Sequence, residues 1–484
     1  MKEETLKEKT AKGLFWGAMS NGVQQVLGIL FGILMGRLLV PEEFGLVAML
    51  LVFSAIANAL QNSGFSTALI NEREQKAGNY NAVFWFNIMM GAGIYVVLFF
   101  CAPLIARYYH EPRLVWLSRY VFLSFVFSSF GVAQAAYLYK NMRAKELAKA
   151  NIIGVLLSSS TAVVMAWAGC SYWAIATQTN LFILISTLLR WHYSEWRPNW
   201  HVDFRFIRRA FPFSIKILLS EVLTQVNSNV MNILLGRYFG SHSTGQYNQA
   251  YQWNFKGYSL VQNMLKQVDQ AVLVSLGDER ERQLAVLRKM VRFAAFIAFP
   301  LMLGFGLVAK EFIVLAIGEK WLTSASYIQI LCVAGAVLPV STLLSDLIIS
   351  RGRSDIFLWC TLLLGICQVA MLMIIHQMGL DVQTMVIAYV CLTLLWLFVW
   401  FFFVRRLTGY KLLMFLKDTV PFALIAFALM ALTWLATKSI TSLWLLLVSR
   451  VVMAAVLYYA VMSLLRVQIF QECVGFFKNK LRKG

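Results

Sequence analysis

Charged residues are scarce in this chain, and their scarcity excludes an ordinary soluble protein. Asp, Glu, Lys and Arg make up 14% of the 484 residues, against about 25% in soluble globular domains. Hydrophobic residues make up 60%. They form runs of the ~20 residues that a membrane-spanning helix needs, almost from end to end. No stretch is left for a soluble domain of any size, so the composition predicts an integral membrane protein.

Motifs for catalysis and metal binding are missing as well. The five histidines have no metal-ligand spacing, the seven cysteines form no Cys-x-x-Cys pair, and no Gly-x-Ser-x-Gly nucleophile motif is present. A Gly-x-x-x-x-Gly-Lys-Ser/Thr nucleotide-binding loop is also absent, so ATP is not expected to drive the protein directly. We therefore expect a protein that is not an enzyme and that has neither a metal nor a cofactor.

Acidic residues are outnumbered by basic ones, and the positive charge invites a nucleic-acid interpretation. The chain has 43 Lys and Arg against 23 Asp and Glu, a formal net charge of +20. These basic residues lie in short loops between apolar runs rather than along one polar face, which argues against nucleic acid as a partner. Alternate loops carry most of them, as cytoplasmic loops do. We expect both termini in the cytoplasm and an even number of spans.

Apolar runs separated by polar breaks give about fourteen candidate transmembrane helices, and hence an all-α fold. The first run follows a charged N-terminal head and has no evident cleavage site, so it is predicted to be a retained span. The candidate spans are residues 13–37, 44–68, 82–105, 114–138, 150–169, 172–190, 211–236, 245–274, 291–309, 323–349, 356–377, 383–404, 418–437 and 443–465.

One sequence pattern, typical of a helix–turn–helix corner, occurs twice in the chain. Residues 33–45 read ILMGRLLVPEEFG and residues 233–245 read ILLGRYFGSHSTG. Six spans separate the two corners, so both halves enter the membrane in the same direction, as a parallel repeat about an axis along the membrane normal. The repeat predicts two six-helix lobes, residues 1–209 and 210–404, followed by two helices and a cytoplasmic tail in residues 405–484.

The shared residues of the corner have structural interpretations. Arg37 and Arg237 are expected to anchor their helix ends at the outer interface of the membrane. Gly45 and Gly245 are expected to permit a tight re-entry into the next span.

The N-terminal stretch KGLFWGAMSNGVQQVLGILFGILMGRLLVPEEFGLVAM, the fourteen spans and the repeated Gly-Arg…Gly corner resemble polysaccharide transporters of the multidrug/oligosaccharidyl-lipid/polysaccharide exporter superfamily. The resemblance covers the whole chain. It implies two six-helix lobes that face each other across a cavity lined by spans 1, 2, 7 and 8, with the last two helices as an appendage. It also implies a flippase for undecaprenyl-pyrophosphate-linked oligosaccharides that lies in the cell inner membrane and works by alternating access.

Polar residues follow one helical face in each of those four spans, because they recur at steps of three and four. Helix-to-helix hydrogen bonds use such residues too, but stripes of this length favour a surface that faces water. We call these stripes polar seams. Their members are Asn21, Gln24 and Gln25; Ser54, Asn58 and Gln61; Glu221, Gln225, Ser228 and Asn232; and Gln249, Gln252, Lys256, Ser259, Asn263, Lys266 and Gln270.

Ionisable residues inside a span are costly and usually functional. Ammonium groups in a low-dielectric cavity attract a pyrophosphate, whereas the N-terminal lobe offers amides, hydroxyls and the aromatic rings of Trp16, Phe65 and Trp85, which suit sugars. Spans 1 to 6 have no basic residue at mid-depth. The predicted substrate-binding residues are Lys216, Lys256, Lys266, Gln25, Gln225, Gln252 and Asn263.

Three carboxylates are candidates for coupling transport to a proton or sodium gradient. They are Glu221, Asp346 and Asp269, and Glu221 and Asp346 would share a proton or ligate a cation. Each also has a structural alternative: Glu221 pairs with Lys216, Asp269 pairs with Lys266, or Asp346 bonds a local cluster of hydroxyls. Arg450, in the appendage, is a further intramembrane charge.

The sequence leaves rival functions open. A multidrug efflux antiporter has the same architecture, and a membrane enzyme or scaffold of glycan assembly belongs to another class. For the flippase, the expected partners are a lipid-linked oligosaccharide, membrane lipid, and a polysaccharide polymerase or other assembly protein.

Overall fold

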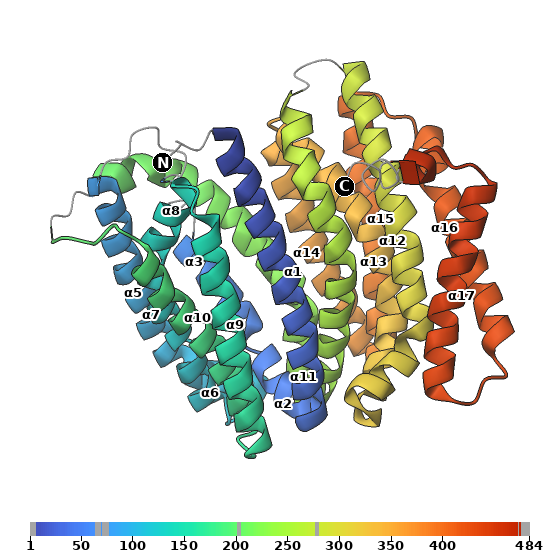
Figure 1. Cartoon of the computed structure of the whole chain (residues 1–484). Coiled ribbons are helices and arrows are strands. Elements are labelled where there is room, and N and C mark those ends of the chain that lie inside the picture. The colour runs from blue at the N-terminus through green and yellow to red at the C-terminus, as the bar shows by residue number, and fades with distance from the viewer. Residues whose placement is uncertain are drawn as a thin grey trace. The chain divides into compact units, whose positions relative to one another are not determined.

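The structure is a computed structural model that describes residues 6–62, 69, 77–200, 205–275, 280–472 and 474–475. All regular secondary structure in these ranges is helical, which confirms the predicted all-α class (Figure 1). The helices up to residue 200 are α1 (Leu6–Leu38), α2 (Pro41–Ala48), α3 (Leu51–Asn62), α5 (Ala77–Tyr109), α6 (Leu114–Val121), α7 (Leu123–Ser129), α8 (Val132–Lys140), α9 (Ala144–Trp167) and α10 (Tyr172–Tyr193). They are followed by α11 (Arg205–Ser275), α12 (Arg280–Ile317), the short 3₁₀ helix η1 (Glu319–Trp321), α13 (Leu322–Ser350), α14 (Ser354–Gln377), α15 (Val382–Thr408), α16 (Leu412–Thr437) and α17 (Leu443–Leu464).

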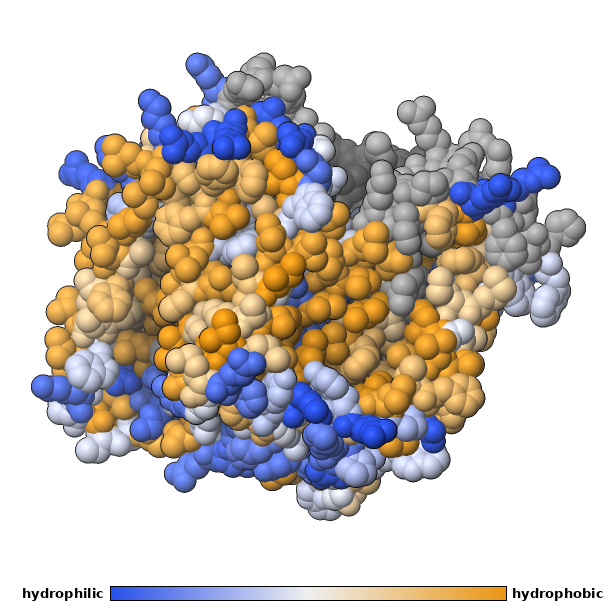
Figure 2. Space-filling view, turned by 180° about the vertical axis from the view of Figure 1, so that it is seen from behind, coloured by the Kyte–Doolittle hydropathy of each residue, from blue (hydrophilic) through white to orange (hydrophobic). Residues whose placement is uncertain are grey.

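The outer surface is that of a membrane protein. On the face shown in Figure 2, hydrophobic side chains form a broad band between two hydrophilic margins. Bulky apolar side chains point outward, such as Trp167 and Phe100, which are 80% and 72% exposed. In a bilayer these side chains contact lipid, where exposure of apolar groups carries no penalty.

Among the described residues, eleven helices are long and apolar enough to cross a membrane, or twelve if the bent pair Leu114–Ser129 and Val132–Lys140 is one span. The predicted count of fourteen is therefore not confirmed. The two predicted spans at 211–236 and 245–274 both fall in α11, which is not among the eleven. Polar side chains lower the hydropathy of α11, although each of its arms is long enough to cross the ~30 Å hydrocarbon core.

The chain divides into two compact units, Met1–Gly245 and Gln246–Gly484, and α11 passes from one to the other. The first unit has a core in which α2, α3, α5, α6 and α7 pack around the fully buried Leu46, Phe122 and Phe125. The second has a core built by α11, α12, α13, α15 and α16 around Val291, Leu344 and Tyr410. The lobe boundary expected at residue 209 remains a prediction.

The two repeated corners cross within the first unit, and this crossing explains their glycines. Gly45 and Gly245 are both in helical conformation. A Cβ atom at Gly45 would lie 1.8 Å from the carbonyl oxygen of Ser241, and a Cβ at Gly245 would lie 1.8 Å from the carbonyl oxygen of Pro41. The two glycines are 200 residues apart, as are Pro41 and Ser241. The backbone of each corner therefore occupies the space that a side chain on the glycine of the other corner would need.

The expectation that Gly45 and Gly245 form a tight turn is therefore wrong. In the second corner the turn is made by Gly240, whose φ of 74° and ψ of −174° break α11. Its counterpart in the first corner, Val40, is extended, with φ −100° and ψ 162°. The shared glycines are needed because the two backbones come close together. In a sequence, a glycine that serves such a contact looks the same as a glycine that serves a turn.

Polar contacts surround the crossing. His242 Nδ1 lies 2.6 Å from Glu42 Oε1, and these two residues are again 200 positions apart. The Arg237 guanidinium contacts the carbonyl oxygen of Tyr108 and the ring of His110. Arg237 thus anchors its corner to the end of α5 rather than only to the interface.

Buried ion pairs attach the last two helices to α12. Arg450 of α17 donates to Glu311 of α12 at 2.8 Å, and both side chains are less than 10% exposed. Arg450 also donates to Leu307 O and to the Thr437 hydroxyl, each at 3.2 Å. The intramembrane charge of Arg450 therefore has a structural partner.

A second pair lies nearer the start of α12. Arg288 makes a bidentate contact with the buried Asp418 of α16, at 2.7 and 3.1 Å, and the Tyr410 hydroxyl donates to the same carboxylate at 2.7 Å. Beyond the last span, Lys289 lies 2.7 Å from Glu472 and its hydrogen bond lowers the pKa of that carboxyl. Charged contacts thus hold the appendage at several points along α12.

We expect Gly45→Ala and Gly245→Ala each to lower the melting temperature of the purified protein, because the added methyl group must push two backbones apart. Gly22→Ala in α1 is the matched control, since a methyl group there meets nothing within 4 Å. It should raise stability slightly, as Ala is favoured over Gly in a helix by about 1 kcal/mol. Equal melting temperatures for all three variants would show that the crossing does not limit stability.

We expect Arg450→Met and Glu311→Gln to destabilise the protein singly by about 3–5 kcal/mol, because each leaves a buried charge without its partner. The double variant should be less destabilised than the sum of the two, since no uncompensated charge is left. Thermal unfolding in detergent of the three variants and the wild type measures this coupling. Additive effects would mean that the pair contributes no mutual stabilisation.

Candidate functional site

The candidate site is made of the polar seams, which the two units carry separately. On the first arm of α11, Gln225 Nε2 donates to Glu221 Oε1 at 3.2 Å, so these two residues interact one turn apart as their spacing predicts. Glu221 and Ser228 are exposed, whereas Asn232 is buried. This seam is open towards residue 221 and closes into the protein towards the corner.

The seam of α1 lies in the same unit. Gln24 donates to the hydroxyl of Ser20 at 2.9 Å and to its carbonyl oxygen at 3.2 Å. Gln25, a predicted substrate-binding residue, is half-buried, and Asn21 is exposed. On α3, Asn58 is exposed and donates to Ser54 O at 2.9 Å.

The predicted aromatic residues of the first unit have definite partners. Lys145 of α9 places its ammonium 5.4 Å from the centroid of the Trp16 ring. The indole of Trp85 donates to Asn199 O at 2.8 Å and packs on Trp200, with ring centroids 4.7 Å apart. Phe65 lies outside the described residues.

On the second arm of α11, only the last described residues of the seam are exposed. Gln249 and Ser259 are buried, Gln252 and Lys256 are half-buried, and Asn263 and Lys266 are exposed. The predicted single wet face is thus open only in its later part. Lys256 places its ammonium 4.3 Å from the centroid of the Trp253 ring, a cation–π contact.

Asp346 lies on α13, which packs against the second arm of α11. It is half-buried and lies one turn beyond Thr342, whose hydroxyl accepts a hydrogen bond from Gln262 at 2.7 Å; Lys266 lies one turn beyond Gln262. The hydroxyls of Thr342 and Ser345 donate to Leu338 O and Thr342 O. These two hydroxyls thus bond main-chain carbonyls of their own helix. Asp346 and Lys266 thus lie on neighbouring helices; the sequence assigned Asp346 to coupling and Lys266 to substrate binding.

Several predicted residues cannot be placed in the site. The side chains of Lys216, Gln61, Asp269 and Gln270 lie outside the described part of the chain. Glu221 belongs to the first unit and Asp346 to the second, so their shared proton remains a prediction.

Sequence reasoning missed polar side chains of α11 that lie beside the seam rather than on it. Gln246, which is 2% exposed, donates to Lys320 O at 2.7 Å and accepts from Ser324 N at 3.0 Å. Gln262 donates to the Thr342 hydroxyl at 2.7 Å. The signal was present, because α11 has more amide side chains than one seam accounts for. These residues dock α11 on its neighbours by the helix-to-helix hydrogen bonds that polar residues in a membrane also form.

In the described ranges, no three His, Cys, Asp or Glu side chains lie close enough together to hold a metal ion. The site consists of amides, hydroxyls, ammonium groups and isolated carboxylates. Such groups can form hydrogen bonds with a polar or anionic molecule.

The comparisons with known proteins agree with this architecture. A family model described as polysaccharide biosynthesis protein matches residues 34–326. An uncharacterised membrane protein from the cps region of Klebsiella pneumoniae is 26% identical over 358 residues, 73% of each chain. The lipopolysaccharide biosynthesis protein WzxC of Escherichia coli is 25% identical over 358 residues, 73% of this chain and 72% of the relative.

A solved structure of the lipid II flippase MurJ, in an inward closed conformation, has a similar fold. It superposes with a TM-score of 0.73 at 14% sequence identity, and the alignment covers 95% of this chain and 99% of MurJ. The family model covers more than half of the sequence, and the fold agrees over nearly all of it. The chain therefore belongs to the polysaccharide biosynthesis protein family, and it shares its fold with the lipid II flippase MurJ.

Proposed function

We propose that this protein is a flippase that moves an undecaprenyl-pyrophosphate-linked oligosaccharide across the inner membrane by alternating access. Its product would be used to assemble a surface polysaccharide such as O-antigen, capsule or exopolysaccharide. The observation that carries the proposal is the polar seam of α11, which includes Lys256 and Lys266 in an otherwise apolar helical protein. Polar side chains at membrane depth are tolerated where they line a water-filled path.

The sign of the charge favours an anionic substrate over a cationic drug. Ammonium groups bind phosphate oxygens by charge-assisted hydrogen bonds. An antiporter for hydrophobic cations would instead need carboxylates and aromatic rings at the same positions. The E. coli relative is named for lipopolysaccharide biosynthesis, and MurJ is named as a lipid flippase; both names support a lipid-linked glycan.

The same reasoning extends to location and partners. Both termini lie in the cytoplasm, as the distribution of basic residues predicts. The protein binds a lipid-linked oligosaccharide and membrane lipid, and works beside a polymerase or other assembly protein. It performs no covalent chemistry on the glycan.

Reconstitution into liposomes tests the function. We expect the purified protein to move a fluorescent lipid-linked oligosaccharide between leaflets, with no export of an ethidium-type dye and no glycosyl transfer. Dye export without glycan movement would identify a multidrug antiporter, and glycosyl transfer would identify an enzyme.

The two lysines of the seam should contribute directly to transport. We expect Lys256→Ala and Lys266→Ala each to slow lipid-glycan movement by about tenfold or more, since a charge-assisted hydrogen bond contributes about 1.5–3 kcal/mol. Lys256→Arg should retain part of the activity. Lys438→Ala removes an exposed lysine between α16 and α17 and is the matched control. Wild-type transport by the Lys256→Ala/Lys266→Ala double variant would exclude pyrophosphate docking at this seam.

Net movement of a large anionic head group needs an energy source, and a proton or sodium gradient can supply it. We expect transport in liposomes to accelerate under an imposed gradient, and Glu221→Gln or Asp346→Asn to abolish that response while glycan binding persists. Protonation would remove a charge that keeps the helix surface hydrated and so bias its packing. If wild-type transport does not respond to either gradient, or if both variants respond as the wild type does, these carboxylates do not couple transport to a gradient.

A further inference from the structure

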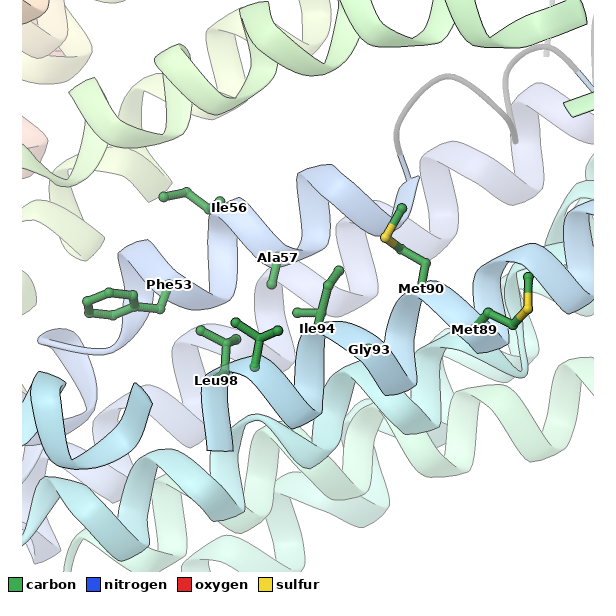
Figure 3. Close-up of a pocket in the computed structure, with 9 residues that line it drawn as sticks. Phe53, Ile56, Ala57, Met89, Met90, Gly93, Ile94 and Leu98 are labelled. Carbon is green, nitrogen blue, oxygen red and sulfur yellow. The ribbon is translucent and has the colours of Figure 1, made fainter. Parts of the chain in front are cut away.

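An apolar groove of about 460 Å³ lies between α3 and α5 of the first unit (Figure 3). Every residue that lines it is apolar. Phe53, Ile56 and Ala57 line it from α3, and Met89, Met90 and Gly93 are among those that line it from α5. In Figure 3, Ala57 points towards the α5 wall, and the two helices form the opposite sides of the groove.

The depth of the groove selects its occupant. The α5 residues that line it fall within 89–98, near the middle of Ala77–Tyr109. At that depth a span is surrounded by the hydrocarbon core. A polar ligand there would lose its hydrogen bonds to water with no replacement from the walls, so the groove suits an aliphatic chain.

Gly93 leaves the space open. A Cβ atom at this position would meet nothing within 4 Å, so any larger side chain would project into unfilled volume. Met89 and Met90 flank it, and their flexible thioether side chains adapt to an irregular hydrocarbon. A methyl-branched chain is irregular in this sense.

The neighbouring face of α3 is polar at the same depth. Ser54 and Asn58 lie about 100° around the helix from Phe53 and Ala57, since successive residues turn by that angle. Asn58 is exposed and donates to Ser54 O. One short helix therefore presents a polar surface and an apolar groove side by side.

This arrangement distinguishes a transported lipid from a resident one. A bilayer lipid keeps its head group at the membrane surface, far from a polar face at mid-depth. A lipid whose sugar head is crossing the membrane has head and tail at the same depth. We propose that the groove between α3 and α5 holds part of the polyprenyl chain of the lipid-linked substrate while its glycan passes along the polar face of α3. This inference rests on the proposed flippase function.

Photo-crosslinking of the full chain in liposomes tests the groove. One probe is undecaprenyl phosphate with a diazirine in its chain, and the other is phosphatidylglycerol with a diazirine in one acyl chain. Mass spectrometry of peptides locates the label. We expect the polyprenyl probe to label residues 89–98, with unlabelled undecaprenyl phosphate competing and phosphatidylglycerol not competing.

Gly93→Leu fills the groove, and Ala92→Leu adds similar bulk to the adjacent exposed position that does not line it. We expect Gly93→Leu to reduce labelling by the polyprenyl probe about tenfold, the effect of withholding about two buried methylene groups. Ala92→Leu should label as the wild type does. The melting temperature of Gly93→Leu should equal or exceed that of the wild type, because leucine is a better helix former than glycine. The melting temperature of Ala92→Leu should match the wild type, because leucine and alanine have similar helix propensities.

Equal labelling by the two probes, or labelling unchanged in a folded Gly93→Leu variant, would overturn the inference and assign the groove to bulk lipid. If Gly93→Leu fails to fold, competition between unlabelled undecaprenyl phosphate and the polyprenyl probe on the wild-type protein still tests whether the groove is specific for this lipid. Glycan movement is measured in the same liposomes. Glycan movement without labelling of the groove would contradict only the proposal that the groove holds the polyprenyl chain. Specific labelling of the groove without glycan movement would contradict the proposed flippase function.

Discussion

The hydrocarbon core of a membrane offers no water to a main-chain amide or carbonyl, and the structure of this protein follows from that constraint. Each span satisfies its backbone within its own helix. In the described part of the chain, helix breaks include Gly240 inside α11, which has a positive φ, and the bend between α7 and α8. The same constraint makes each intramembrane charge costly, which is why Arg450 and Asp418 are paired as well as buried.

The two similar corner sequences pack directly on each other. Gly45 and Gly245 are needed because each backbone enters the space that a side chain would fill in its counterpart. Glu42 and His242 occupy equivalent positions in the two copies and form a polar pair beside the crossing. The two corners thus make a reciprocal contact in which each glycine meets the backbone of the other corner.

The polar seams differ from the rest of the spans because they carry many polar side chains. Some of their amides, such as Gln249, are buried against neighbouring helices, whereas Asn263 and Lys266 remain exposed. Other amides on α11, such as Gln246 and Gln262, dock the helix on η1 and α13. One helix therefore combines structural hydrogen bonds with a surface suited to a polar cargo. A helix so polar is stable in a membrane only where protein and water, rather than lipid, surround it.

The sequence by itself determined that this is an all-α membrane protein, because apolar runs of span length have no other stable solution in a bilayer. It also located the repeat and the residues of the seams, since both are patterns in one dimension. Tertiary structure alone decided what each pattern does. The glycines of the corner serve a backbone crossing rather than a turn, and Arg450 has its partner Glu311 139 positions earlier in the chain. The open and closed parts of the seam depend on which helices cover α11, as does the hydrogen bond from Gln262 to Thr342. Such contacts join residues distant in sequence, so they depend on helix packing that periodicity and composition do not encode.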